Sequence, residues 1–177
     1  MHEDDSERDR RRRFDELVAP LRTDLFRYAF WLGRDRGLAE DVVQEAMLRA
    51  WRSLGDLQDR GAVKPWLLTI VRREHARQFE RKRLETTDID NLPPADQSRL
   101  AGGHSADVED VRRAIFMLDD GYREPLVLQV LMGYSTVEIA QMMSIEQGAV
   151  LTRLYRARKK LRRKLEKSRA ARHNGRA

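Results

Sequence analysis

The chain has 177 residues, of which 41% are hydrophobic and 36% are charged, with a formal net charge of +6. Its mean hydropathy of −0.71 is too polar for one large buried core, so the composition favours two thin helical bundles. The absence of cysteine excludes disulfides, thiolate zinc sites and thiol catalysis. No window approaches the roughly 20 apolar residues of a membrane span, so we expect a soluble, cytoplasmic protein without membrane insertion.

The first elements in chain order are an arm and a helix. Residues 1–12 are almost wholly charged, which predicts a disordered arm. From Phe14 to Leu32, apolar residues recur at spacings of three and four, which lays one stripe along a helix. Pro20 interrupts this stripe, and we expect it to kink the helix or to restart it.

Two more helices are predicted before the chain changes character. The next covers residues 38–51 and carries acids in its first turn, where they favour the helix dipole. Pro65 stands at a plausible first-turn position of a third helix, which covers residues 66–83 and is mainly basic in its second half. Together these elements predict a first helical domain over residues 13–84.

The periodic pattern disappears over residues 85–105, where Pro-Pro and Gly-Gly pairs indicate a flexible linker. Ser105 is the expected cap of the helix that follows. Residues 106–168 predict a second helical domain, and residues 169–177 a disordered basic tail. The expected fold class is therefore all-α, with two small helical domains joined by a flexible linker.

The second domain ends in the sharpest local signal. Residues 135–138 (Ser-Thr-Val-Glu) and 144–147 (Ser-Ile-Glu-Gln) both match capping boxes, nine positions apart. This spacing predicts a helix-turn-helix, whose second helix has one apolar and one basic face. The major groove of DNA admits such a helix. Packing or an acidic membrane surface is the alternative, which we disfavour because a membrane helix needs no capped partner.

Positive charge is concentrated in the last quarter of the chain. From Arg153 to Arg176 the only acid is Glu166, so this segment would be drawn to a polyanion. Charge alone fits a solvated helix face with a frayed tail equally well.

Three blocks of the sequence resemble, in order, the extracytoplasmic-function (ECF) sigma factors of bacterial RNA polymerase. The first, AEDVVQEAMLRAW at residues 39–51, is similar to the polymerase-binding helix of sigma domain two. The second, WLLTIVRR at residues 66–73, is similar to the promoter-reading helix of the same domain. The third, from YREPLVLQVLMGYSTVEIA through GAVLTRLYRARKKLRRKL, resembles sigma domain four. Any one block could arise by chance, but their order and separation argue against coincidence.

The resemblance implies that the partners are the large subunits of core RNA polymerase and promoter DNA, and it admits an anti-sigma factor as a further partner. It implies no cofactor, no metal and no catalytic residue. The stripe expected to dock on the polymerase consists of Asp41, Gln44, Glu45, Leu48 and Trp51. Helical spacing supports this stripe, although a place in the core is equally open for Trp51.

Contacts to the two promoter elements are also implied, with phosphate contacts setting register and base contacts giving specificity. The residues expected at the minus-ten element are Arg72, Arg73, His75, Arg77, Gln78 and Arg81. The residues expected at the minus-thirty-five element are Gln147, Leu151, Thr152, Arg153, Tyr155, Arg156 and Lys160.

The chain departs from the family's frequent pattern at several of these positions. Arg73 and Arg77 stand where the family often has Asn and Asp, which makes that helix more basic. Leu151 stands where a lysine is common, which removes a cation from the groove-facing start of the recognition helix.

Two other functions fit parts of the chain. A stand-alone helix-turn-helix regulator would use the amino-terminal half as a ligand or dimer domain and would bind a symmetric operator without polymerase. An enzyme is disfavoured because the four histidines are scattered over two tails, a basic helix and the linker, which leaves no metal or acid-base cluster. These are His2, His75, His104 and His173.

Overall fold

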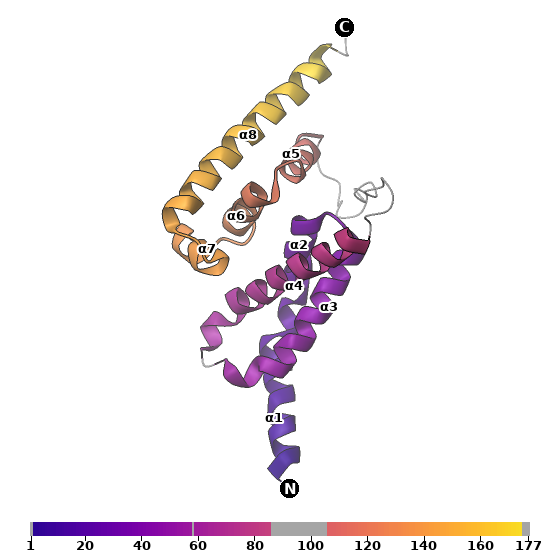
Figure 1. The fold of residues 1–177 in the computed structure, drawn as a ribbon, viewed down its shortest axis with the longest axis vertical. Coiled ribbons are helices and arrows are strands. Elements are labelled where there is room, and N and C mark those ends of the chain that lie inside the picture. The colour runs from indigo at the N-terminus through magenta and orange to yellow at the C-terminus, as the bar shows by residue number, and fades with distance from the viewer. Residues whose placement is uncertain (1, 58, 86–105, 175–177) are drawn as a thin grey trace. The chain divides into compact units, whose positions relative to one another are not determined.

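The computed structural model describes residues 2–57, 59–85 and 106–174, which belong to two compact units (Figure 1). Unit 1 spans Met1–Ala95 and unit 2 spans Asp96–Ala177. All regular elements among the described residues are helices, which confirms the all-α fold with two helical domains. The predicted linker lies, apart from Glu85, outside the described residues, as does Ser105. No described helix is both long enough and apolar enough to cross a membrane.

Unit 1 consists of α1 (His2–Leu17), α2 (Arg22–Gly33), α3 (Arg36–Ser53) and α4 (Val63–Glu85). The helices α2, α3 and α4 pack against one another, whereas most of α1 extends away from them (Figure 1). Apolar residues at spacings of three and four meet in the core because those spacings fall on one helix face. Side chains with no exposed surface include Leu25, Tyr28, Val42, Ala46, Leu67, Leu68 and Val71.

The junctions of unit 1 follow from local chemistry. Pro20 lies in a short 3₁₀ segment (Ala19–Leu21) that separates α1 from α2, which confirms that the helix restarts there. At the end of α2, Arg34 adopts the left-handed conformation with φ 58°. The Asp35 side chain then accepts a hydrogen bond of 3.0 Å from the backbone N–H of Leu38 and caps α3.

The structure of the amino-terminal arm differs from the prediction. Residues 1–12 were expected to be disordered, but α1 begins at His2. This stretch contains no glycine or proline, and Asp9 pairs with Arg12 one turn away at 2.8 Å. Its charge therefore excludes it from a core without excluding it from a helix.

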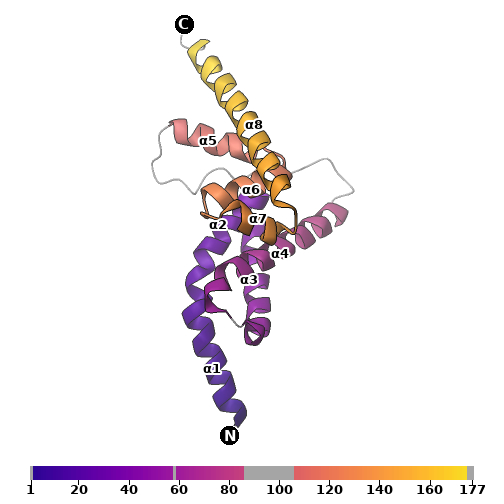
Figure 2. The same ribbon diagram turned by 90° about the vertical axis from the view of Figure 1, so that its left-hand side faces the viewer.

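Unit 2 consists of α5 (Ala106–Phe116), α6 (Asp120–Val130), α7 (Thr136–Met143) and α8 (Gln147–Asn174). The long helix α8 packs on α5, α6 and α7, and its last turns run beyond them (Figures 1 and 2). Residues 169–174 of the tail predicted to be disordered are helical, and these six positions contain no glycine or proline. The core of unit 2 includes Leu118, Leu126, Val127, Leu128, Ile139, Val150, Leu154 and Ala157.

One of the two predicted capping boxes is present. At the start of α7, Ser135 Oγ accepts from the N–H of Glu138, and Glu138 Oε2 accepts from the N–H of Ser135 at 2.8 Å. The second predicted capping box, at residues 144–147, is not formed, so that prediction is wrong. Ser144 adopts the left-handed conformation with φ 54°, and its N–H closes α7 by bonding to the Ala140 carbonyl, so α8 begins only at Gln147.

Candidate interaction surfaces

The first candidate surface is the exposed stripe of α3. Asp41, Gln44 and Leu48 are all exposed, Leu48 to 47%. They lie at helical spacings on one side of α3, opposite the buried side that includes Val42 and Ala46. The stripe thus combines a carboxylate, an amide and an exposed apolar side chain, which suits a partner with a basic and partly apolar surface.

The two other residues predicted for this stripe have partners within unit 1. Glu45 is partly buried and lies 3.3 Å from Arg49 Nε and 3.7 Å from Arg77 Nη2. The ring of Trp51 meets the ring of Phe14 edge to face, with centroids 5.3 Å apart. Trp51 is half-buried and helps to hold α1 against α3, which favours the alternative of a packing role.

A second feature, which sequence reasoning missed, is a carboxylate between α3 and α4. Glu74 is only 2% exposed and lies 2.6 Å from Arg49 Nε and 2.7 Å from Arg77 Nη2. We call Glu45, Arg49, Glu74 and Arg77 the charge network. A buried carboxylate needs such partners because desolvation disfavours an unpaired charge. Its spacing of three from Val71, which the apolar stripe of this helix includes, is the sequence signal that could have identified Glu74 as a core-facing residue.

The basic surface of α4 is smaller than predicted. Arg73 and Arg81 are exposed, whereas Arg72 and Gln78 are half-buried. Arg77 is exposed, but its guanidinium belongs to the charge network. Among the cations predicted for this surface, only Arg73 and Arg81 are both exposed and outside the charge network.

His75 does not belong to this surface. It is 9% exposed and lies beneath the end of α2, where a Cβ at Gly33 would come within 2.6 Å of its Nε2. Its ring stacks on Phe79, with centroids 6.2 Å apart, and Phe79 itself is 44% exposed. The spacing of four between the two rings was visible in the sequence, but the close approach of α2 was not.

The second candidate surface is the outer face of α8, opposite its buried residues Val150, Leu154 and Ala157. We define this face by the exposed residues Gln147, Leu151, Thr152, Tyr155 and Arg156. Within the helix-turn-helix, Gln147 Nε2 donates a hydrogen bond of 3.0 Å to Thr136 Oγ1 of α7. This bond ties the start of α8 to the preceding helix.

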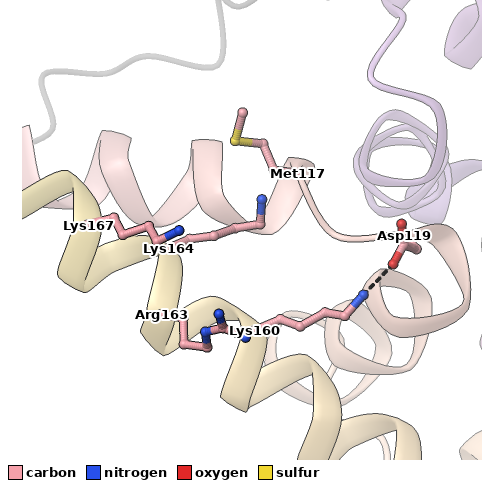
Figure 3. A pocket seen from close by; sticks show the side chains of 6 residues that line it. All are labelled: Met117, Asp119, Lys160, Arg163, Lys164 and Lys167. Carbon is pink, nitrogen blue, oxygen red and sulfur yellow. Dashed lines mark hydrogen bonds and ion pairs between the residues drawn. The ribbon is translucent and has the colours of Figure 1, made fainter.

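Two of the cations predicted for this face lie at its flank. Arg153 is half-buried, and Lys160 turns toward α6, where its Nζ lies 2.6 Å from Asp119 Oδ2 and 4.5 Å from the centroid of the Tyr122 ring. Figure 3 shows Lys160 reaching Asp119 at one side of a hollow between α8 and the end of α5. The other residues lining the hollow are Met117, Arg163, Lys164 and Lys167.

The contact between Asp119 and Lys160 alters the titration of the acid. The hydrogen bond from Lys160, together with its positive charge, lowers the pKa of Asp119 below the ordinary value. Lys160 therefore has an anionic partner within unit 2, and a phosphate would have to compete with it.

A buried arginine, also missed in the sequence, fixes the turn between α5 and α6. Arg123 is 6% exposed and donates hydrogen bonds to the carbonyls of Phe116 and Leu118 at 3.1 and 3.0 Å. It also pairs with Asp120. The carbonyls at the end of α5 are thus satisfied by a side chain from the next helix. An arginine two positions before the apolar run from Pro125 to Leu128 was its sequence signal.

Comparison with known proteins supplies independent information on both units. The family model for sigma-70 region 2 matches residues 17–85, and that for sigma-70 region 4 matches residues 109–161. The ECF RNA polymerase sigma factor SigM of Mycobacterium tuberculosis H37Rv is 31% identical over 155 residues, covering 86% of this chain and 76% of that protein. EcfG of Rhodopseudomonas palustris, also an ECF RNA polymerase sigma factor, is 30% identical over 149 residues, covering 83% and 81%.

Solved structures show the same likeness. The sigma factor RpoE from Bartonella quintana, in complex with the anti-sigma factor NepR, matches with a TM-score of 0.73 and 26% identity over 86% of this chain and 96% of that one. CnrH, in complex with the cytosolic domain of CnrY, matches with a TM-score of 0.63 and 28% identity over 88% and 89%.

Proposed function

The chain belongs to the extracytoplasmic-function sigma factors of the sigma-70 family, and from this membership we propose that it binds core RNA polymerase, recognises the minus-ten and minus-thirty-five promoter elements and promotes strand opening. Because polymerase supplies the chemistry, the chain would catalyse no reaction of its own. It would act in the cytoplasm, together with polymerase. The observation that carries the proposal is the presence, in one chain, of units matching both sigma region 2 and sigma region 4. A stand-alone helix-turn-helix regulator would need only the second.

We assign polymerase binding to the α3 stripe. Asp41, Gln44 and Leu48 support this assignment because they are exposed together and take no part in the charge network. Glu45 is a weaker candidate, since part of its charge is already paired with Arg49 and Arg77. Trp51 would contribute indirectly, through its packing on Phe14.

We assign the promoter elements to α4 and α8. On α4, Arg72, Arg73, Gln78 and Arg81 would contact minus-ten DNA. On α8, the outer face would enter the major groove at the minus-thirty-five element, as the second helix of a helix-turn-helix does. Arg153 would contact phosphate at the edge of this interface, where it supplies charge without reading sequence. Lys160 would do so only by leaving Asp119.

An anti-sigma factor is a further proposed partner. The support is the solved complex of the related Bartonella sigma factor with the anti-sigma factor NepR. Such a partner would compete with polymerase or with DNA for the surfaces assigned above.

A reconstitution experiment tests the proposed function. The purified full chain is added to core polymerase, and open-complex formation is measured on a library of promoter sequences. We expect opening only when both chain and polymerase are present, with two enriched elements separated by a spacer. Binding to a symmetric operator without polymerase, and no opening with it, would instead establish a stand-alone regulator.

The α3 stripe has its own test. The double substitution Asp41→Lys and Leu48→Ala should weaken association with core polymerase by about 1–2 kcal/mol, roughly fivefold to thirtyfold. The exposed Glu16 of α1 provides the control, since Glu16→Lys changes the net charge equally without touching the stripe. Affinity is measured by titrating labelled chain with core polymerase, and circular dichroism checks the helix content. Unchanged affinity of the double variant would remove the stripe from the polymerase interface.

A further inference from the structure

We propose that α8 reads thymine in the minus-thirty-five element through its 5-methyl group, with Leu151 and Tyr155 as the specificity-determining residues. This inference rests on the proposed function and adds the base chemistry that the promoter must present. The outer face of α8 carries the exposed side chains Leu151 and Tyr155 at the point where it would meet bases.

The position of the two side chains supports base contact. Both lie in the first three turns of α8, where a recognition helix held by its partner meets base edges. Leu151 is 53% exposed and Tyr155 is 66% exposed. They are four residues apart, so they are neighbours on the helix surface and form one strip. The strip is therefore open to contact with a ligand.

The polar side chains beside the strip already donate within unit 2. Thr152 Oγ1 donates a hydrogen bond of 2.9 Å to the Gly148 carbonyl. Gln147 Nε2 donates to Thr136 Oγ1 at 3.0 Å. The strip therefore relies less on hydrogen bonds than on apolar contact to discriminate between bases.

Thymine is the base that such a strip recognises. In the major groove the four bases present donors and acceptors, and thymine also presents an apolar methyl group. Leu151 carries neither a donor nor a charge, so it cannot bind the acceptors of guanine. An exposed leucine therefore predicts thymine at the base pair that this side chain contacts.

The charge around the strip favours DNA over a protein partner. The exposed Arg156 and Lys159 follow Tyr155 on the same side of α8, and residues 147–165 contain no acid. Cations without interspersed acids complement the phosphates on both sides of a groove. The apolar strip and its basic border thus match thymine methyl groups set between phosphates.

The test removes the methyl group and leaves the base pair intact. Holoenzyme formed from core polymerase and the full chain first selects its preferred minus-thirty-five element from a DNA library. Each thymine in that element is then replaced singly by deoxyuridine, and binding is measured again. At one or two positions we expect affinity to fall about fourfold, as the burial of one methyl-sized group implies.

The variants connect this loss to the side chains. With Leu151→Ala, thymine and deoxyuridine should bind equally at the position that Leu151 reads, whereas Leu151→Lys should select guanine there. With Tyr155→Phe the discrimination at its own position should persist, and with Tyr155→Ala it should disappear. The matched control is Leu131→Ala, since Leu131 is 47% exposed but lies just after α6 and outside the outer face of α8.

The possible failures can be distinguished. If the holoenzyme selects a minus-thirty-five element but binds thymine and deoxyuridine equally at every position, the methyl readout is wrong and the proposed function stands. The readout is also wrong if discrimination survives both Leu151→Ala and Tyr155→Ala. If no minus-thirty-five element is selected at all, the proposed function fails first.

Discussion

The helices α4 and α8 are both rich in arginine and lysine, yet they use these residues differently. In α4, the buried Glu74 holds Arg77, and Arg49 from α3 completes the contact. In α8, the outer face carries no acid from residue 147 to residue 165, and Lys160 finds its acid, Asp119, on the flank. The cations of a basic helix are therefore divided between structure and binding by the acids that lie near them, on the same helix for Arg77 and at the start of another for Lys160.

Because of this difference, substitutions in α4 and in α8 should have different effects. In α4, a change in the charge network should affect folding of unit 1 before it affects DNA binding. In α8, the exposed residues of the outer face should change binding while leaving unit 2 folded, because Val150, Leu154 and Ala157 carry the packing on the other side. The following predictions test this division.

The largest expected effect concerns the carboxylate between α3 and α4. Glu74→Ala should destabilise unit 1 by about 3 kcal/mol, because it leaves two guanidinium groups beside a buried gap. Hydrogen exchange should accelerate in α3 and α4 but not in α8. Glu80→Ala, an exposed position on the same helix, should change stability by less than about 0.5 kcal/mol. If Glu74→Ala costs no more than Glu80→Ala, the charge network does not hold the two helices together.

Replacing two glycines of unit 1 by alanine should change the free energy of unfolding in opposite directions. Gly33→Ala should cost about 1–3 kcal/mol, because its Cβ would approach His75 Nε2 to 2.6 Å. Gly37→Ala should stabilise α3 by up to about 1 kcal/mol, since its Cβ would meet only Asp35 Oδ1 at an ordinary 3.5 Å. Denaturant unfolding of the two variants measures both effects. Equal changes would mean that α2 does not press on His75 as described.

The part of the fold that the sequence predicted rests on local signals. Apolar periodicity located the helices of both units, Pro20 marked the restart before α2, and Ser135 marked the start of α7. Each of these depends on residues within about one turn of each other, so no knowledge of tertiary structure was needed. The Ser144 box failed because Ser144 takes the left-handed conformation that ends α7, which its residue type does not indicate.

The composition of the candidate surfaces was less predictable because it depends on contacts between helices. His75 was placed with the basic residues of α4, but the approach of α2 at Gly33 buries it. Lys160 was placed with the groove-facing residues, but Asp119, which is 41 positions away in sequence, draws it to the flank. Helical spacing gives the direction of a side chain and not the identity of its neighbour.

A smaller effect distinguishes two adjacent lysines of α8. Lys159→Met should flatten the salt dependence of promoter binding by about 0.9 if Lys159 contacts one phosphate. Lys160→Met should flatten it less, because Asp119 already neutralises much of that charge. The measurement is holoenzyme affinity for one promoter over a series of salt concentrations. An equal or greater change for Lys160 would show that it leaves Asp119 to bind DNA.

The smallest expected effect is a change in the pKa of Asp119, which reports the contact between Asp119 and Lys160 in the absence of DNA. The pKa of Asp119 lies below the ordinary value of about 3.9, mainly because Lys160 donates a hydrogen bond to it. A lowered pKa in the folded state stabilises the fold above the ordinary pKa, and that contribution is lost as pH falls through the folded pKa. Carboxyl NMR should show the Asp119 pKa rising toward the ordinary value in Lys160→Met and changing little in Lys159→Met. If both variants titrate like the parent, the hydrogen bond does not persist in solution, and Lys160 returns to the group of cations available to phosphate.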